Sequence, residues 1–182
     1  MENPAPEFRG GEVRVGWNAD GLWTLARMED ECIFTQATRD NEKLWLLGDV
    51  FEIFVRDMAG EEYLELHAAP TGHRLQLCFA SDQVIEHLRN GHLEVEELMV
   101  DEPLFCLKVR TAPDCWEVLA CVSAIKGRAL RASFSRYDYR DADTPPVLSS
   151  TSMHREVNYH RQHEWAELRL VGQEVPLRAG QG

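Results

Sequence analysis

The side chains best suited to chemistry in this sequence belong to three consecutive segments in which polar and apolar residues alternate. The segments cover residues 49–55, 62–68 and 74–79, and their period of two is typical of β-strands. Carboxylates, an imidazole, a guanidinium and an amide at these positions could bind the hydroxyls of a ligand or transfer protons. These residues are Glu52, Glu65, His67, Arg74 and Gln76.

The turns between the segments predict how the three strands pair. A four-residue turn at 57–60 sets Glu52 opposite Glu65, and a turn at 69–72 sets Glu65 opposite Gln76 and His67 opposite Arg74. The strands would then form a meander with one polar face. The other face is expected to be apolar and to carry Phe51, Ile53, Val55, Leu64, Leu66, Leu75 and Leu77.

A polar sheet face of this kind has two interpretations. Antiparallel sheets commonly have one face in water, so it could be an ordinary solvated face. Opposed carboxylates, however, destabilise a sheet unless a cation, a proton or the hydroxyls of a ligand lie between them. Glu52 and Glu65 could also form the carboxyl pair of a retaining glycosidase, since that mechanism needs carboxyls about 5 Å apart.

Aspartates at the turns and one tryptophan extend the set of candidates. Asp30, Asp40 and Asp49 could contribute oxygen ligands to a calcium ion. Trp45, which precedes the central strand, is either a stacking platform or a core residue. The tryptophans expected in the core are Trp17, Trp23, Trp116 and Trp165.

Composition excludes several classes of partner. The chain has 182 residues, a net charge of −12 and a pI near 5.0. Such an acidic chain is a poor match for nucleic acid or for an anionic membrane surface. Five cysteines show no paired metal-binding spacing, and the sequence opens without a signal peptide. We therefore expect reduced thiols and a cytoplasmic protein, or a secreted one if a leader has been removed.

The order of elements predicts a single all-β domain over residues 1–182. Its ordered core should cover about 8–172, between flexible tails at 1–7 and 173–182. About ten short strands, with one helix over Ser81–Leu88, favour an antiparallel β-sandwich of the jelly-roll or immunoglobulin-like type. Further strands are expected at Cys32–Thr35 and Leu93–Val100, and a long loop at residues 138–159.

Four patterns along the chain resemble carbohydrate-binding module family 9. They run from about Val13 to Leu170, and their order and spacing carry the likeness more than any single piece does. The patterns are Leu22-Trp23 with Asp30 and Ile33; Leu44-Trp45 with Asp49 to Phe54; Tyr63-Leu64-Glu65 with Pro70-Thr71-Gly72; and Phe134-Ser135-Arg136, Leu148-Ser149-Ser150, Tyr159-His160 and Trp165.

The resemblance implies a sugar-binding β-sandwich, with structural calcium in some members. It implies that Trp45 stacks against a sugar ring while Glu52 and Arg74 bond its hydroxyls. Arg136 is expected to reach the same patch, and Glu65 and Gln76 join the set through the predicted register. The ligand would be a xylo- or cello-oligosaccharide, bound without catalysis by a monomer or weak dimer.

One departure from the family pattern concerns the long loop. Members often have a tryptophan within its Ser-Ser run, where this chain has Thr151. If that tryptophan is half of an aromatic clamp, the resemblance implies that this half is missing here.

Some similar sandwiches hold haem, which gives an alternative function. The axial candidates would be Met58, Lys108, Met153 and His154. Haem would require two of them to meet across a deep apolar pocket.

Overall fold

The computed structural model describes residues 8–125 and 127–172, which form two stacked antiparallel sheets. The tails expected at 1–7 and 173–182 lie outside the described residues. The first sheet has the strand order β1-β2-β7-β6. Its strands are β1 (Gly11–Asn18), β2 (Gly21–Glu29), β7 (Cys115–Val122) and β6 (Phe105–Ala112). The all-β sandwich expected from the sequence is confirmed.

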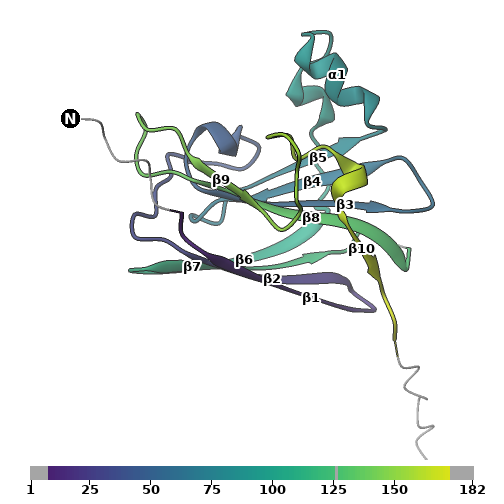
Figure 1. Cartoon of the computed structure of the whole chain (residues 1–182), viewed down its shortest axis with the longest axis horizontal. Coiled ribbons are helices and arrows are strands. Elements are labelled where there is room, and N and C mark those ends of the chain that lie inside the picture. Colours follow the sequence, from purple (N-terminus) through teal and green to yellow (C-terminus); the bar gives the residue numbers. More distant parts are fainter. Residues whose placement is uncertain (1–7, 126, 173–182) are drawn as a thin grey trace, which may run out of the picture.

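The second sheet carries the polar segments described above. Its order is β10-β8-β3-β4-β5, and the short β9 pairs with the same edge of β8 as β10 does. Figure 1 shows it as a layer above the first sheet. Its strands are β3 (Val50–Asp57), β4 (Tyr63–Ala68), β5 (Arg74–Phe79), β8 (Ala129–Asp138), β9 (Val147–Ser150) and β10 (Ala166–Arg169).

Helices are few and short. The α-helix α1 (Gln83–Arg89) follows β5 and stands above the second sheet, on the side away from the first (Figure 1). Three 3₁₀ helices complete the fold: η1 (Leu44–Leu46), η2 (Val95–Leu98) and η3 (Gln162–Glu164).

Three local expectations were wrong. Leu93–Val100 is not a strand, because Glu94 and Glu97 form a reciprocal capping box that starts η2. Cys32–Thr35 contributes only an isolated bridge, from Thr35 to Gly48. The expected loop at 138–159 contains β9, whose residues pair with the end of β8.

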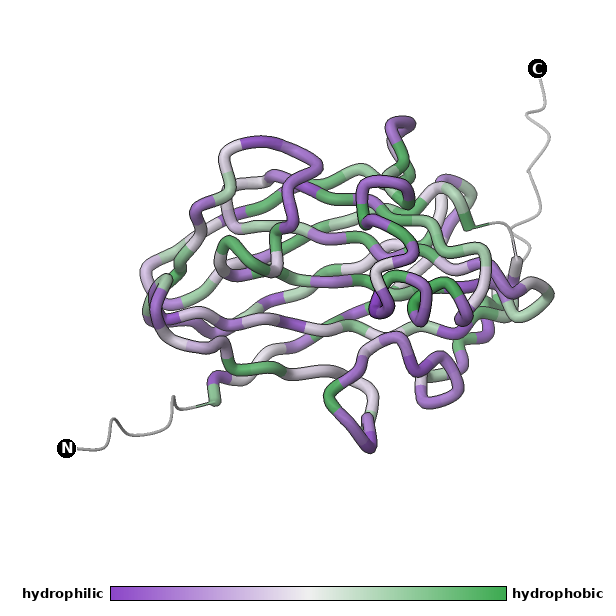
Figure 2. Tube along the Cα trace, turned by 90° about the horizontal axis from the view of Figure 1, so that it is seen from above, coloured by the Kyte–Doolittle hydropathy of each residue, from purple (hydrophilic) through white to green (hydrophobic). Residues whose placement is uncertain are grey.

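Apolar residues pack on both faces of the second sheet. Phe51, Ile53 and Val55 of β3 point into the core between the sheets, whereas Val50 and Phe54 belong to a second cluster on the outer face. In Figure 2 the strands carry green, hydrophobic residues, and the longer purple, hydrophilic stretches lie mainly in the loops. The outer cluster also includes Tyr63, Leu75, Leu77, Phe79, Tyr159 and Trp165. Trp116 and Trp165 are buried as expected, while Trp17 and Trp23 are half-buried.

The pairing of β3 with β4 differs from the expected register by two residues. Glu52 lies opposite His67, and Glu65 lies opposite Phe54. A shift of two keeps every side chain on its face, so Glu52 and Glu65 still share the outer face. The predicted opposition of the two carboxylates is nevertheless wrong.

The pairing of β4 with β5 differs by one residue, which reverses the faces of β5. Glu65 lies opposite Leu77, and Ala68 lies opposite Arg74. The cause is a loop of five residues rather than four, because Gly72 adopts a left-handed φ of +87° and His73 joins the turn. Leu75 and Leu77 therefore lie on the outer face, not on the core face where the sequence placed them.

No helix among the described residues is long and apolar enough to cross a bilayer. All five cysteines are free thiols in this structure.

Candidate functional site

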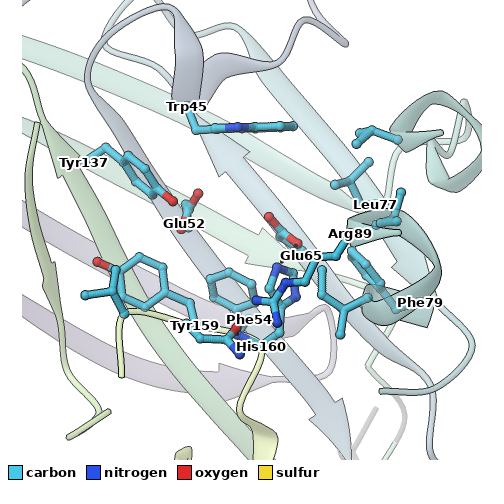
Figure 3. Close-up of a pocket in the computed structure, with 15 residues that line it drawn as sticks. Trp45, Glu52, Phe54, Glu65, Leu77, Phe79, Arg89, Tyr137, Tyr159 and His160 are labelled. Carbon is cyan, nitrogen blue, oxygen red and sulfur yellow. Dashed lines mark hydrogen bonds and ion pairs between the residues drawn. The ribbon is translucent and has the colours of Figure 1, made fainter. Parts of the chain in front are cut away.

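A pocket of about 330 Å³ opens on the outer face of the second sheet, between η1, α1 and the loop before η3. Its floor comes from β3, β4 and β5, and its walls are largely aromatic or apolar (Figure 3). The volume lies at the lower end of the range for small-molecule sites. Its lining residues are Trp45, Glu52, Phe54, Glu65, Leu77, Phe79, Ile85, Leu88, Arg89, Val95, Tyr137, Val157, Asn158, Tyr159 and His160.

The segment before β3 positions Trp45 at one wall. The Tyr139 hydroxyl donates to the Trp45 carbonyl at 2.6 Å. Gly48 lies so close to the chain at Phe34 that an added Cβ would be 2.4 Å from a carbonyl oxygen, and its φ is +142°. A side chain at position 48 would therefore displace the segment that carries Trp45. The indole is half-buried and meets the His67 ring edge-on at 5.5 Å.

The loop before η3 supplies the opposite wall. The Trp165 indole donates to the Tyr159 carbonyl at 2.7 Å, which anchors this loop to the outer cluster. The His160 ring is held by Tyr63, whose hydroxyl lies 2.9 Å from Nδ1. Figure 3 shows Trp45 across the pocket from Tyr159 and His160, with the carboxyls of Glu52 and Glu65 between them.

Two carboxyls and an imidazole meet at the floor. His67 Nε2 lies 2.7 Å from Glu65 Oε1 and 3.4 Å from Glu52 Oε1. His160 Nε2 lies 3.7 Å from Glu65 Oε2. The side chains of Glu52, Glu65 and His67 are at most 7% exposed. Among the described residues, Glu52 Oε2, Glu65 Oε2 and the hydroxyl of Tyr159 are buried without a hydrogen-bond partner.

The surroundings shift the pKa values of the two acids in opposite directions. Burial raises the pKa of Glu52 to about 8, and the nearby Glu65 adds to the rise while His67 opposes it. Burial also acts on Glu65, but His160 and His67 outweigh it and lower the pKa of that carboxyl. The pKa of His67 is raised because Glu52 and Glu65 overcome the effect of its burial. Near neutral pH Glu52 is thus mainly protonated, whereas the two imidazoles favour the ionised form of Glu65.

The structure brings three of the six site residues expected from the sequence to this pocket. Trp45, Glu52 and Glu65 line it. Arg74, Gln76 and Arg136 do not, so the expected convergence of Trp45, Glu52, Arg74 and Arg136 on one patch is wrong. The one-residue shift in register turns Arg74 and Gln76 away from the pocket. Arg136 lies opposite Phe51 in the neighbouring strand, so its side chain points to the same face as Phe51, away from the pocket.

The three displaced residues have structural partners. Arg74 pairs with Asp40 at 3.4 Å and donates to the Phe105 carbonyl. The Gln76 amide donates to the Val100 carbonyl and accepts from the Leu104 backbone N–H. These contacts fix the segment between η2 and β6 against the edge strand β5.

Arg136 pairs with acids between the two sheets. It contacts Asp30 at 3.0 Å and Asp138 at 3.1 Å, and it donates to the Glu29 carbonyl. Asp30, Asp49 and Asp138 lie close enough together to hold a cation. Asp40, the third aspartate expected at a calcium site, is not in this group and pairs with Arg74 instead.

Thr151 lies outside the pocket. Its backbone N–H and side-chain oxygen bond the backbone of Phe134, beside the pairing of β9 with β8. The aromatic wall opposite Trp45 comes instead from Tyr159, with Tyr137 beside it (Figure 3). Sequence reasoning missed both tyrosines as site residues. The signal was present in part, because Tyr159-His160 belongs to a motif quoted above.

The axial haem candidates do not gather at this pocket. Met153 is 94% exposed, and His154 pairs with Glu164 at 3.2 Å. Neither they nor Met58 and Lys108 line the cavity.

Comparison with solved structures shows what the fold is similar to. A family 9 carbohydrate-binding module from Caldicellulosiruptor kristjanssonii, in complex with cellotriose, matches with a TM-score of 0.67 and 15% identity, over 98% of this chain and 84% of that one. The chain shares the fold of family 9 carbohydrate-binding modules. The glucose complex of a family 9 module from the same organism matches with a TM-score of 0.64 and 16% identity, over 96% of this chain and 83% of that one.

A third structure has the same fold. It is a protein from Bacteroides uniformis described as carbohydrate-binding, with a TM-score of 0.65 and 12% identity, over 91% of this chain and 80% of that one. No protein-family model and no curated protein matches the sequence. The family 9-like fold thus rests on structure, at identities too low to transfer individual contacts.

Proposed function

We propose that the pocket binds a carbohydrate, and that Trp45 stacks against one face of a sugar ring. The observation that carries this proposal is the pairing of aromatic walls with carboxyl oxygens that lack partners. A sugar ring has an apolar face that packs on an indole and a rim of hydroxyls that bond carboxyl and phenol groups. Glu52 and Tyr159 offer such groups between and beside the aromatic rings.

The ligand class follows from the shape and chemistry of the pocket. Its volume of about 330 Å³ is suited to about one sugar ring. The family 9-like structures hold cellotriose and glucose. We therefore propose cello-oligosaccharides as the first ligands to test, with xylo-oligosaccharides beside them.

We propose binding without catalysis. The solved structures with this fold are described as carbohydrate-binding modules or as a carbohydrate-binding protein, which supports a binding role. If the protein hydrolyses the same oligosaccharides and Glu65→Gln abolishes that activity, this assignment is contradicted and the glycosidase alternative is restored.

The test is calorimetric titration of cellotriose and xylotriose into the protein and into Trp45→Ala. We expect the variant to fold and to bind at least tenfold more weakly, since stacking is worth about 1 kcal/mol beyond the buried area. Trp23→Ala is the matched control, because Trp23 is also half-buried but lies on the other sheet.

Two results would overturn the proposal. A folded Trp45→Ala variant that binds as tightly as the parent would remove the stacking role. Absence of binding by the parent to a wide glycan array would remove the function. If Trp45→Ala fails to fold, Tyr159→Phe tests the same pocket, because it removes only an unpartnered hydroxyl.

A further inference from the structure

Glu52, Glu65 and His67 have the composition of a metal centre. Each offers one ligand atom, and these three atoms lie within 4.8 Å of one another. His67 Nε2 faces both acids, at 2.7 Å and 3.4 Å. Two donors that each lie about 2.0–2.2 Å from one ion are themselves separated by about 3–3.5 Å, so only small shifts would admit an ion between them.

Ionising both acids of the cluster would require a further positive charge, since without one Glu52 keeps its proton. Two ionised carboxylates beside a neutral imidazole would bury two negative charges at a site where these side chains are at most 7% exposed. Isolated buried charges are strongly unfavourable. Among the residues that the structure describes, no arginine or lysine forms a salt bridge with Glu52, and its Oε2 is buried without a hydrogen-bond partner. A divalent cation would balance both acids at once.

We propose that Glu52, Glu65 and His67 bind a divalent transition-metal ion at the pocket floor, with His160 as a fourth ligand. The protein can bind this ion whether or not it also binds a sugar. The site deepens that function only in that the ion would face the cavity, where it could accept a ligand hydroxyl.

His160 is already oriented for this role. Its Nδ1 meets the Tyr63 hydroxyl at 2.9 Å, which leaves Nε2 directed at Glu65 Oε2, 3.7 Å away. Metal-bound histidines usually have such a partner for their second nitrogen, and it fixes the ring and its tautomer. The contacts of His160 with Phe54 and Phe79 restrain the ring further.

The donor set selects the class of metal. Two imidazole nitrogens and two carboxylates suit zinc or another first-row transition ion. Calcium takes six to eight oxygen ligands and has little affinity for imidazole. Zinc is therefore the probe, and calcium is the comparison.

The test is calorimetric titration of Zn²⁺ into the full chain, after treatment with a chelator and its removal. We expect one tight site per chain and binding of Ca²⁺ at least tenfold weaker at this site. Glu52→Gln and His67→Gln should each weaken zinc binding at least tenfold. His163→Gln, which removes an exposed imidazole outside the cluster, should bind like the parent.

The aspartate cluster needs its own control. Asp138→Asn should leave zinc affinity unchanged, because that acid belongs to the separate group near Arg136. Loss of zinc binding in Asp138→Asn, or equal binding by the parent and Glu52→Gln, would overturn the proposal. If His67→Gln does not fold, the nearly isosteric Glu52→Gln still decides the result.

Cellotriose titrations with and without zinc keep the two proposals apart. Zinc binding without any sugar binding supports the metal site and contradicts the proposed function. Sugar binding by a protein that binds no zinc supports the proposed function and contradicts the metal site.

Discussion

Glu52 illustrates how a single residue can be predicted correctly for its face and incorrectly for its partner. Its position in an alternating strand predicted a polar residue on the side opposite Phe51 and Ile53, and the structure confirms this. Its neighbour across the strand is His67 rather than Glu65. Loop length decides that neighbour, and loop length is weakly encoded because turns of four and six residues accept similar sequences.

The buried acid has a measurable consequence in the metal-free protein. The pKa of Glu52 rises from 4.5 to about 8 on folding, chiefly through burial. The folded state therefore holds this proton more tightly than the unfolded chain does. The resulting stabilisation is complete below about pH 4.5 and is lost as the pH rises through about 8. With chelator present, the free energy of unfolding should fall between pH 6 and pH 9.

Urea unfolding at several pH values checks this expectation, and Glu52→Gln provides the comparison. One titrating group contributes a slope of at most about 1.4 kcal/mol per pH unit. The variant should show a shallower fall, because glutamine is neutral at every pH. Parallel profiles for the two proteins would mean that Glu52 titrates normally. Asp49, whose pKa is also raised by burial to about 8, contributes equally to both profiles.

At the scale of elements, the wall formed by α1 differs from the strands beneath it. None of its seven residues is buried, and only Val84, Ile85 and Leu88 pack against the outer cluster. The strands β3 and β4, in contrast, lie between two apolar layers. Elements with few buried apolar contacts open with a small free energy. The pocket thus has a rigid floor and one easily opened wall.

Hydrogen exchange measured by mass spectrometry tests this contrast. Amides of Gln83–Arg89 should exchange far earlier than those of Val50–Asp57, and a bound sugar should slow α1 most. Equal protection of the two segments in the free protein would contradict the expectation. If a bound sugar does not slow exchange in α1, the ligand lies away from this wall.

The strand β5 shows where sequence reasoning stopped. Leu75, Leu77 and Phe79 alternate with Arg74, Gln76 and Cys78, so either set could face the core. The apolar set faces outward because Phe54 and Tyr63 already make that face apolar, and Phe79 stacks on Tyr63 with ring centroids 4.4 Å apart. Attention to those two aromatics would have favoured the observed register. The backbone carbonyls that accept from Arg74 and Gln76 come from the distant segment 100–105, and the ion-pair partner of Arg74 is Asp40, which the strand pattern does not reveal.

For the whole molecule, the cluster around Arg136 connects the two sheets. Arg136 belongs to β8, and its partners are the Glu29 carbonyl at the end of β2 and Asp30 just beyond it. Asp49 accepts from the backbone N–H groups of Phe34 and Tyr139, which joins two further segments. The guanidinium supplies positive charge where the sequence led us to expect calcium.

We expect Arg136, rather than calcium, to provide most of the stability here. Loss of one member of a buried ion pair costs about 3–5 kcal/mol, so Arg136→Gln should lower the melting temperature strongly. Arg131→Gln on the same strand should have a small effect, because its pair with Glu167 is more exposed.

The parent protein should melt at the same temperature in calcium and in chelator. A rise of several degrees in calcium that disappears in Asp49→Asn would show that a bound ion contributes at this cluster by mass action.

The double-sided sheet has a consequence for how this fold diverges. Along β3, Phe51, Ile53 and Val55 serve the core between the sheets, while Glu52 and Phe54 serve the pocket. Neighbouring codons are therefore under different selective constraints, since one set must fit the core between the sheets and the other must fit the outer cluster and the pocket. A change at a polar floor residue such as Glu52 could then alter the binding chemistry while the core face of the strand stays the same. The family 9 module shares this architecture at 15% identity, so the fold does not depend on one particular set of outer-face residues.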